Sequence, residues 1–101
     1  MTADESADDP VLDALFATIE DRKANLPEGS YTASLFTHEK GENATLEKVG
    51  EESTEVVLAA KDGDREALVA ESADLVYHLL VVLAMHDLTV DDLRGELESR
   101  F

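Results

Sequence analysis

The sequence has 101 residues, with 24 Asp and Glu against eight Lys and Arg, which gives a net charge of −16 at pH 7. A chain of this length forms one domain with a modest core, and its charge repels nucleic-acid phosphates and anionic membranes, so we expect neither as a partner. The absence of cysteine excludes disulfides, thiolate zinc sites and thiol nucleophiles, and fits a reducing, cytoplasmic location.

The acidity also has a general explanation. Only four Lys and one Ile accompany the 24 acids, whereas Ala and Val are abundant. This balance is typical of proteins from a salt-rich cytoplasm, in which surface carboxylates keep the folded state hydrated. Residues 1–9 contain four acids and no base, which predicts a disordered acidic tail before a single domain at 10–101.

Two helices are expected in the first third of the chain. Pro10 suits the first position of a helix capped by Asp9, and an amphipathic pattern continues to about residue 25. The Pro27 to Gly29 segment breaks this helix. Ser30 can then cap a short helix over residues 31–37.

Three further helices are expected over residues 44–61, 65–86 and 90–101. Asp62 to Asp64 form the turn between the first two, and Thr89 with Asp92 matches a capping box for the last. Because no segment alternates with a period of two residues, the sequence predicts an all-α fold.

The helix over residues 65–86 is apolar almost all round between Leu75 and Met85. A helix without a polar face is buried on all sides, and the other four helices offer little material to cover it. We therefore expect a homodimer, or a larger even oligomer, in which a partner subunit covers this helix.

Two pairs of carboxylates lie three residues apart on the two longest helices. Glu52 and Glu55 share one face of the first helix, and Glu71 and Asp74 share one face of the second. Spacing alone is weak evidence in so acidic a chain. However, Glu71, Asp74 and His78 fall on one side of a helix that is otherwise apolar, so these acids are expected to be buried.

Buried carboxylates need compensation, and no Lys or Arg lies between Glu66 and Arg94. A set of carboxylates from two helices suits Mg²⁺, with Mn²⁺ as an alternative, rather than zinc. A cluster neutralised by ion pairs or by a second subunit is the other interpretation. His78, one turn from Asp74, can orient a bound carboxylate or water, or be a hydrogen-bonded core residue.

Gly50 inside a helix suggests close approach of another group, either a packed helix or a ligand. Lys48 and Lys61 lie on either side of Glu52 and Glu55 along the same helix. They suit either phosphate contacts or ion pairs, such as Lys48 with Glu51 or Glu52.

The motifs closely resemble those of the phosphoribosyl-ATP pyrophosphohydrolase family of histidine biosynthesis. The resemblance covers about residues 11–100 and rests on three segments: Ser30-Tyr31-Thr32, the run from Glu47 to Lys61, and the run from Glu71 to Leu80. The acid skeleton alone is shared by the wider MazG-like superfamily of all-α pyrophosphohydrolases. The Lys-Val-Gly-Glu-Glu and Tyr-His extensions are more specific.

This resemblance implies a MazG-like helical bundle completed by dimerisation, with Mg²⁺ bound by Glu52, Glu55, Glu71 and Asp74. The implied reaction is hydrolysis of phosphoribosyl-ATP to phosphoribosyl-AMP and pyrophosphate. The implied catalytic residues are Glu51, Glu52 and Glu55, of which Glu51 contributes to the surroundings of the metal or to a second metal. The substrate-binding residues that the resemblance suggests are Lys48, Lys61, Ser30, Tyr31, Thr32, Tyr77 and His78.

In some relatives this domain is fused to a cyclohydrolase, for which 101 residues leave no room, so a separate cyclohydrolase is expected to perform the next step. Two other functions fit parts of the pattern. One is a house-cleaning pyrophosphohydrolase for ordinary or damaged nucleoside triphosphates, and the other is a metal-free, acidic helical interaction module.

Overall fold

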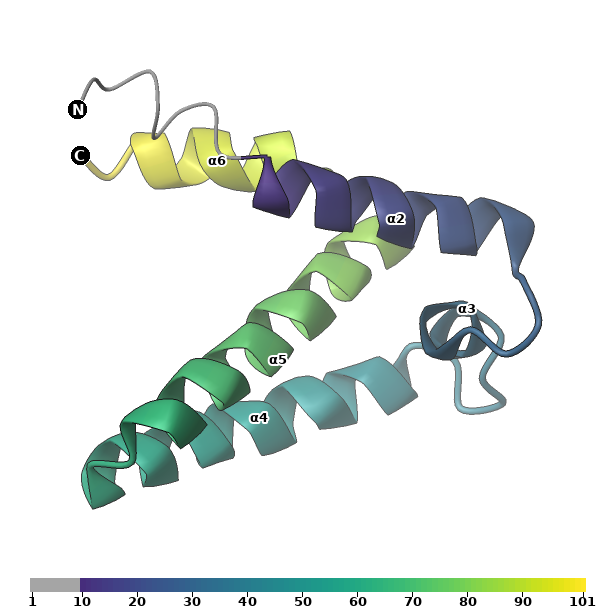
Figure 1. Cartoon of the computed structure of the whole chain (residues 1–101). Coiled ribbons are helices and arrows are strands. Elements are labelled where there is room, and N and C mark those ends of the chain that lie inside the picture. Colours follow the sequence, from purple (N-terminus) through teal and green to yellow (C-terminus); the bar gives the residue numbers. More distant parts are fainter. Residues whose placement is uncertain (1–9) are drawn as a thin grey trace.

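The computed structural model describes residues 10–101, so the predicted acidic tail over 1–9 lies outside the described residues. Within these residues five helices follow one another: α2 (Val11–Asn25), α3 (Tyr31–Phe36), α4 (Asn43–Asp62), α5 (Arg65–Met85) and α6 (Val90–Glu98). No strand occurs within residues 10–101, which confirms the all-α prediction. The long helices α4 and α5 run side by side as a hairpin, and α2 crosses the C-terminal end of α5 (Figure 1).

The helix ends follow local capping chemistry. The backbone N–H of Ala33 donates to Ser30 Oγ at 3.1 Å, as predicted for the start of α3. Thr89 and Asp92 form the predicted capping box of α6, with reciprocal bonds of 2.8 and 3.2 Å. At the α4–α5 turn, Gly63 adopts φ +69°, a left-handed conformation that glycine adopts without steric cost.

Two helix ends differ from prediction. Pro10 is the N-cap of α2 rather than its first residue, and the helix begins at Val11. The last helix ends at Glu98 instead of Phe101, and Phe101 is 98% exposed. Without apolar contacts, the final residues gain too little from burial to extend the helix.

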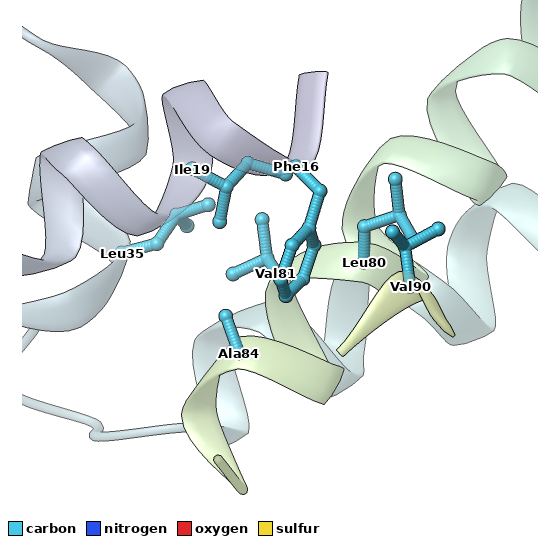
Figure 2. Close-up of a cluster of buried hydrophobic side chains, with 7 residues drawn as sticks. All are labelled: Phe16, Ile19, Leu35, Leu80, Val81, Ala84 and Val90. Atoms are coloured by element: carbon cyan, nitrogen blue, oxygen red, sulfur yellow. The ribbon is translucent and has the colours of Figure 1, made fainter. Parts of the chain in front are cut away.

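The hydrophobic core lies around the C-terminal half of α5 (Figure 2). Its buried members come from four helices: Phe16, Ile19, Leu35, Leu80, Val81, Ala84 and Val90. Ile19, Leu80, Val81 and Ala84 are fully buried. This core joins α2, α3 and α6 to one end of α5, while α4 packs along α5 and extends to its other end.

Within residues 10–101 the single chain leaves part of α5 uncovered, as expected from the little material that the other helices offer. Val69 is 71% exposed, and Val76 and Leu79 are 39% and 42% exposed. The reason is geometric: α2, α3 and α6 surround only the C-terminal half of this helix. By length and composition α5 is also long and apolar enough to cross a membrane, a property that core helices of soluble proteins share.

No helix of the described chain packs closely against Gly50, although such packing is one of the two expectations for it. A Cβ atom built at Gly50 meets no heavy atom within 4 Å among the described residues, and the residue is exposed. Gly50 therefore lies on an open surface of α4 in this chain.

Lys23 fastens the end of α2 to the end of α5. Its Nζ atom donates to the backbone oxygen of Ala84 at 2.6 Å and to Asp87 Oδ1 at 2.8 Å. The hydrogen bond and charge of Lys23 lower the pKa of Asp87, and Asp87 raises the pKa of Lys23.

Replacing Asp87 by asparagine is expected to lower stability at pH 7 by a modest amount, because this exposed ion pair is lost while Lys23 still reaches Ala84. A lowered pKa means that the pair stabilises the fold above the ordinary aspartate pKa of about 4, and that this contribution disappears at lower pH. Urea midpoints of wild type and Asp87→Asn should therefore converge below about pH 4. A constant difference between pH 7 and pH 3 would contradict this account.

Candidate functional site

The α4–α5 hairpin brings the two predicted pairs of carboxylates together. Glu52 and Glu55 belong to α4, and Glu71 and Asp74 belong to α5. The pKa of Glu71 is raised, first by partial burial and then by the negative charges of Asp74, Glu55 and Glu52. The charges of the other three acids thus act on Glu71 across the hairpin, and no positive charge within residues 10–101 offsets them there. These four residues are called here the acid cluster.

The acids are less buried than the sequence suggested. The Glu52 side chain is only 13% exposed, but Glu55 and Asp74 are exposed and Glu71 is half-buried. The cause is the same as for α5 itself, because this half of the hairpin has no third helix against it. Only Glu52 lies close to buried surroundings in the single chain.

A cavity of about 360 Å³ opens beside the acid cluster at the turn end of the hairpin. Glu55 and Glu71 line it from opposite helices, together with Leu58, Ala59, Asp62, Asp64, Ala67 and Ala70. The sequence reasoning had assigned Asp62 and Asp64 only to the turn. Their place beside Glu55 and Glu71 depends on how the hairpin closes, which residue spacing does not reveal.

The carboxylates of the acid cluster suit a divalent cation by their chemistry. Four carboxylates offer the hard oxygen ligands that Mg²⁺ and Mn²⁺ prefer, and their mutual repulsion at Glu71 is what a cation would relieve. Within residues 10–101, no three Asp, Glu or His side chains are already gathered closely enough to form a metal centre. The fit to a cation thus lies in the oxygen donors and their charge, and not in a geometry that is already assembled.

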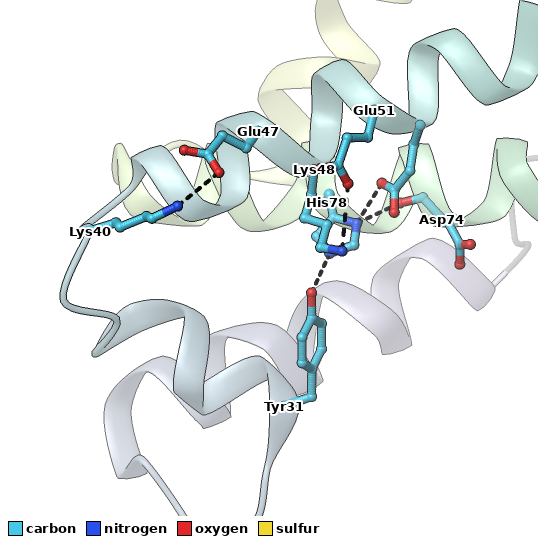
Figure 3. A network of polar contacts seen from close by, with 8 residues as sticks. Tyr31, Lys40, Glu47, Lys48, Glu51, Asp74 and His78 are labelled. Atoms are coloured by element: carbon cyan, nitrogen blue, oxygen red, sulfur yellow. Dashed lines mark hydrogen bonds and ion pairs between the residues drawn. The ribbon is translucent and has the colours of Figure 1, made fainter.

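His78 lies at the centre of a network that joins three helices (Figure 3). Its Nδ1 atom lies 2.7 Å from Glu52 Oε1 on α4 and 3.0 Å from the backbone oxygen of Asp74. Its Nε2 atom lies 3.0 Å from the hydroxyl of Tyr31 on α3. His78 is 5% exposed, so these contacts are shielded from water.

Two neighbouring tyrosines complete this network. The Tyr77 ring packs edge-on against the His78 ring at 4.8 Å between centroids, and the Tyr31 ring does so at 6.0 Å. The Tyr77 hydroxyl also bonds to Thr32 Oγ1. The family resemblance suggests each of these residues for substrate binding, but it does not predict the hydrogen bonds between them.

Ser30 stands apart from this group. Its side chain caps α3, and it lines a second cavity of about 260 Å³ between Leu26 and Thr37 rather than the acid cluster. The structure therefore brings Tyr31, Thr32, Tyr77 and His78 together and leaves Ser30 in a helix-capping role.

The two predicted lysines have different surroundings. Lys48 Nζ lies 3.6 Å from Glu51 Oε2, an ion pair that the sequence offered as one interpretation, and its charge lowers the pKa of Tyr31 against the effect of burial. Lys48 thus lies near the His78 network. Lys61 is exposed in the last turn of α4 and forms no ion pair among the described residues.

Comparison with known proteins identifies a family. The family described as phosphoribosyl-ATP pyrophosphohydrolase matches residues 12–101. A protein of Haloarcula marismortui named phosphoribosyl-ATP pyrophosphatase is 72% identical over 90 residues, which cover 89% of this chain and 92% of the relative. Relatives with the same name include one from Natronomonas pharaonis, 64% identical over 99% of both chains, and one from Methanococcoides burtonii, 52% identical over 93% of this chain and 95% of the relative.

Several of these relatives come from halophilic archaea, which supports the salt-rich origin predicted from the composition.

Proposed function

The chain belongs to the phosphoribosyl-ATP pyrophosphohydrolase family, and we propose that it hydrolyses phosphoribosyl-ATP to phosphoribosyl-AMP and pyrophosphate with the help of Mg²⁺. The enzyme class, a pyrophosphatase of histidine biosynthesis, follows from family membership over residues 12–101. The metal, the bond cleaved and the residue roles are our proposals. The observation that carries them is the meeting of four carboxylates from two helices, where partial burial and the charges of Asp74, Glu55 and Glu52 raise the pKa of Glu71.

In this proposal the acid cluster holds the cation. When bound, Mg²⁺ would offset the charge of the triphosphate and favour ionisation of the attacking water. The water oxygen would bond to one of the two phosphorus atoms as the P–O bond that bridges the α and β phosphates breaks. The bridging oxygen leaves with the other phosphoryl group, the proton of the water passes to solvent, and the products are phosphoribosyl-AMP and pyrophosphate. The negative charges near Glu71 repel one another, and a bound divalent cation would relieve this repulsion, so the repulsion favours cation binding.

The remaining site residues surround this reaction. Lys48 and Lys61 would contact phosphate oxygens as point charges. In the free chain Lys48 pairs with Glu51 at 3.6 Å. The side of the acid cluster that faces α3 would be lined by Tyr31 and Thr32 from α3 and by Tyr77 and His78 from α5. A substrate role for Ser30 competes with its function as the cap of α3.

The test is product analysis with the full chain at high salt, because a charge of −16 is best screened there. Phosphoribosyl-ATP should yield equal amounts of phosphoribosyl-AMP and pyrophosphate with Mg²⁺, weaker or similar turnover with Mn²⁺, and none with excess EDTA. Release of inorganic phosphate would contradict the bond assignment. Turnover in EDTA would contradict the role of the cation.

We also propose a homodimer, or a larger even oligomer, built on the exposed apolar side chains of the α4–α5 hairpin. These are Leu46, Val57, Leu58, Val69, Val76 and Leu79, each between 39% and 71% exposed. Apolar surface gains about 25 cal/mol per Å² when it is covered, so a second copy would stabilise the hairpin. This assembly gives α5 a protein partner.

Light scattering at micromolar concentration is expected to give a mass at least twice the 11.0 kDa of the chain. Val57→Glu, which places a charge at one of these exposed apolar positions, should shift the protein toward monomer. Thr18→Glu, on exposed α2, is the matched control that should leave the mass unchanged. A folded wild-type monomer would contradict the proposed assembly.

A further inference from the structure

The contacts of His78 fix the direction of its hydrogen bonds. The backbone oxygen of Asp74 and the carboxylate of Glu52 both face Nδ1, and a carbonyl oxygen only accepts. Nδ1 therefore carries the hydrogen and donates toward both oxygens. In the neutral ring Nε2 is then a bare acceptor, so the hydroxyl of Tyr31 donates to it at 3.0 Å.

The surroundings of Tyr31 support this direction. Partial burial raises the pKa of Tyr31, and this effect is larger than the opposing effect of the Lys48 charge. The phenol thus keeps its proton at neutral pH and remains a donor. The edge-on packing of Tyr31 and Tyr77 against the imidazole restricts rotation of the ring.

We propose that Tyr31 and His78 form a hydrogen-bonded chain that fixes the Glu52 carboxylate by its Oε1 atom and presents Oε2 to the cation. This inference rests on the proposed function, in which Glu52 is a cation ligand. It makes His78 a positioning residue, and it links the docking of α3 to the geometry of the acid cluster. Among the described residues, Oε1 is the Glu52 oxygen that is hydrogen-bonded.

A hydrogen bond of this kind orients a ligand before the cation arrives. Partners behind a metal ligand typically change metal affinity by about 10- to 100-fold when they are removed. Glu52 is the acid that the structure holds in this way, because the Glu55 and Asp74 side chains are exposed and Glu71 is half-buried. We therefore expect the His78 bond to influence affinity for the cation more than it influences the stability of the fold.

A second bond between α3 and α5 provides a matched control. Thr32 and Tyr77 also tie α3 to α5, but neither residue forms a hydrogen bond with Glu52 among the described residues. Tyr77→Phe therefore weakens the same docking and keeps the ring beside His78. Tyr31→Phe likewise removes one hydroxyl and keeps a ring, but it interrupts the chain to Glu52.

The first experiment reads the tautomer of His78 by ¹⁵N NMR of imidazole nitrogens in the full chain without metal. His38 and His86 are the other two histidines, so single substitutions assign the signals. We expect a neutral ring protonated at Nδ1, with an Nε2 signal that shifts in Tyr31→Phe and stays in place in Tyr77→Phe. A ring protonated at Nε2, alone or together with Nδ1, would overturn the inference.

The second experiment measures Mn²⁺ binding by electron paramagnetic resonance. His78→Gln, which lacks a donor at the Nδ1 position, should bind Mn²⁺ about 10-fold or more weakly, and Tyr31→Phe about 2- to 5-fold more weakly. His78→Asn places an amide N–H near the Nδ1 position and should recover most of the affinity. Tyr77→Phe should match wild type.

Equal Mn²⁺ affinity in wild type, Tyr31→Phe and His78→Gln would overturn the inference, and so would equal losses in Tyr31→Phe and Tyr77→Phe. If His78→Gln does not fold, the Mn²⁺ affinities of Tyr31→Phe and Tyr77→Phe and the tautomer of His78 still test the inference. Neither readout uses the nucleotide, so failure of the chain to hydrolyse phosphoribosyl-ATP would contradict the proposed function separately.

Discussion

Replacing Glu71 by glutamine is expected to lower Mg²⁺-dependent kcat/KM for phosphoribosyl-ATP by about 10²- to 10³-fold while the helical fold remains intact. The substitution keeps the shape of the side chain and removes one negative charge from the acid cluster. A bound cation supplies several kcal/mol of charge stabilisation in reactions of this type, and about 1.4 kcal/mol corresponds to a factor of ten in rate. Loss of one ligand from a set of four should therefore reduce activity strongly.

The same substitution should not destabilise the protein without metal. The pKa of Glu71 is raised by partial burial and by Asp74, Glu55 and Glu52, so the charged form of this carboxyl is disfavoured in the folded state. Glutamine removes that repulsion, and the thermal midpoint in EDTA should stay equal or rise. Activity and stability are thus expected to move in different directions.

Glu66→Gln is the control for this prediction. Glu66 lies in the first turn of the same helix, is exposed, and lies outside the acid cluster. The two variants carry the same change in charge, so a general electrostatic effect would alter both. Equal Mg²⁺-dependent turnover in wild type and Glu71→Gln would remove Glu71 from the set of proposed ligands.

The helices could be predicted because their signals are local. A cap such as Ser30, a capping box such as Thr89 with Asp92, and a left-handed glycine at residue 63 each act on the backbone within one turn. Burial could not be predicted in the same way. The apolar pattern of α5 is real, but it does not say which part of the helix the same chain covers, and Val69 is exposed.

For the same reason, only part of the candidate site could be predicted from the sequence. Pairs three residues apart share a helix face, so Glu52 with Glu55 and Glu71 with Asp74 could be predicted as two coupled pairs. Contacts between helices depend on how those helices cross. The bond from His78 to Glu52 joins residues 26 positions apart, and that from Tyr31 to His78 joins residues 47 apart, so no spacing rule predicts them.

Substrate selectivity is the second large effect that we expect. The kcat/KM for phosphoribosyl-ATP should exceed that for ATP and for deoxynucleoside triphosphates by at least about 100-fold. The acid cluster explains cleavage of a triphosphate but does not distinguish these substrates, which share that group. Selectivity must come from the phosphoribosyl group, whose extra phosphate can bind a lysine. A charge-assisted hydrogen bond contributes about 1.5–3 kcal/mol, or roughly 10- to 150-fold.

Lys48 is the lysine that the structure places near the His78 network. Burial raises the pKa of Tyr31, the charge of Lys48 opposes that rise, and Lys48 pairs loosely with Glu51 at 3.6 Å. Lys48→Met should therefore reduce the preference for phosphoribosyl-ATP over ATP by about 10-fold or more, with a smaller effect on ATP itself. Lys40→Met is the matched control, because Lys40 is exposed and pairs with Glu47 at 3.2 Å (Figure 3). Similar rates on deoxynucleotides in the wild type would instead indicate a house-cleaning enzyme. An unchanged preference in Lys48→Met would assign recognition of the extra phosphate to other residues, of which Lys61 is the next to substitute.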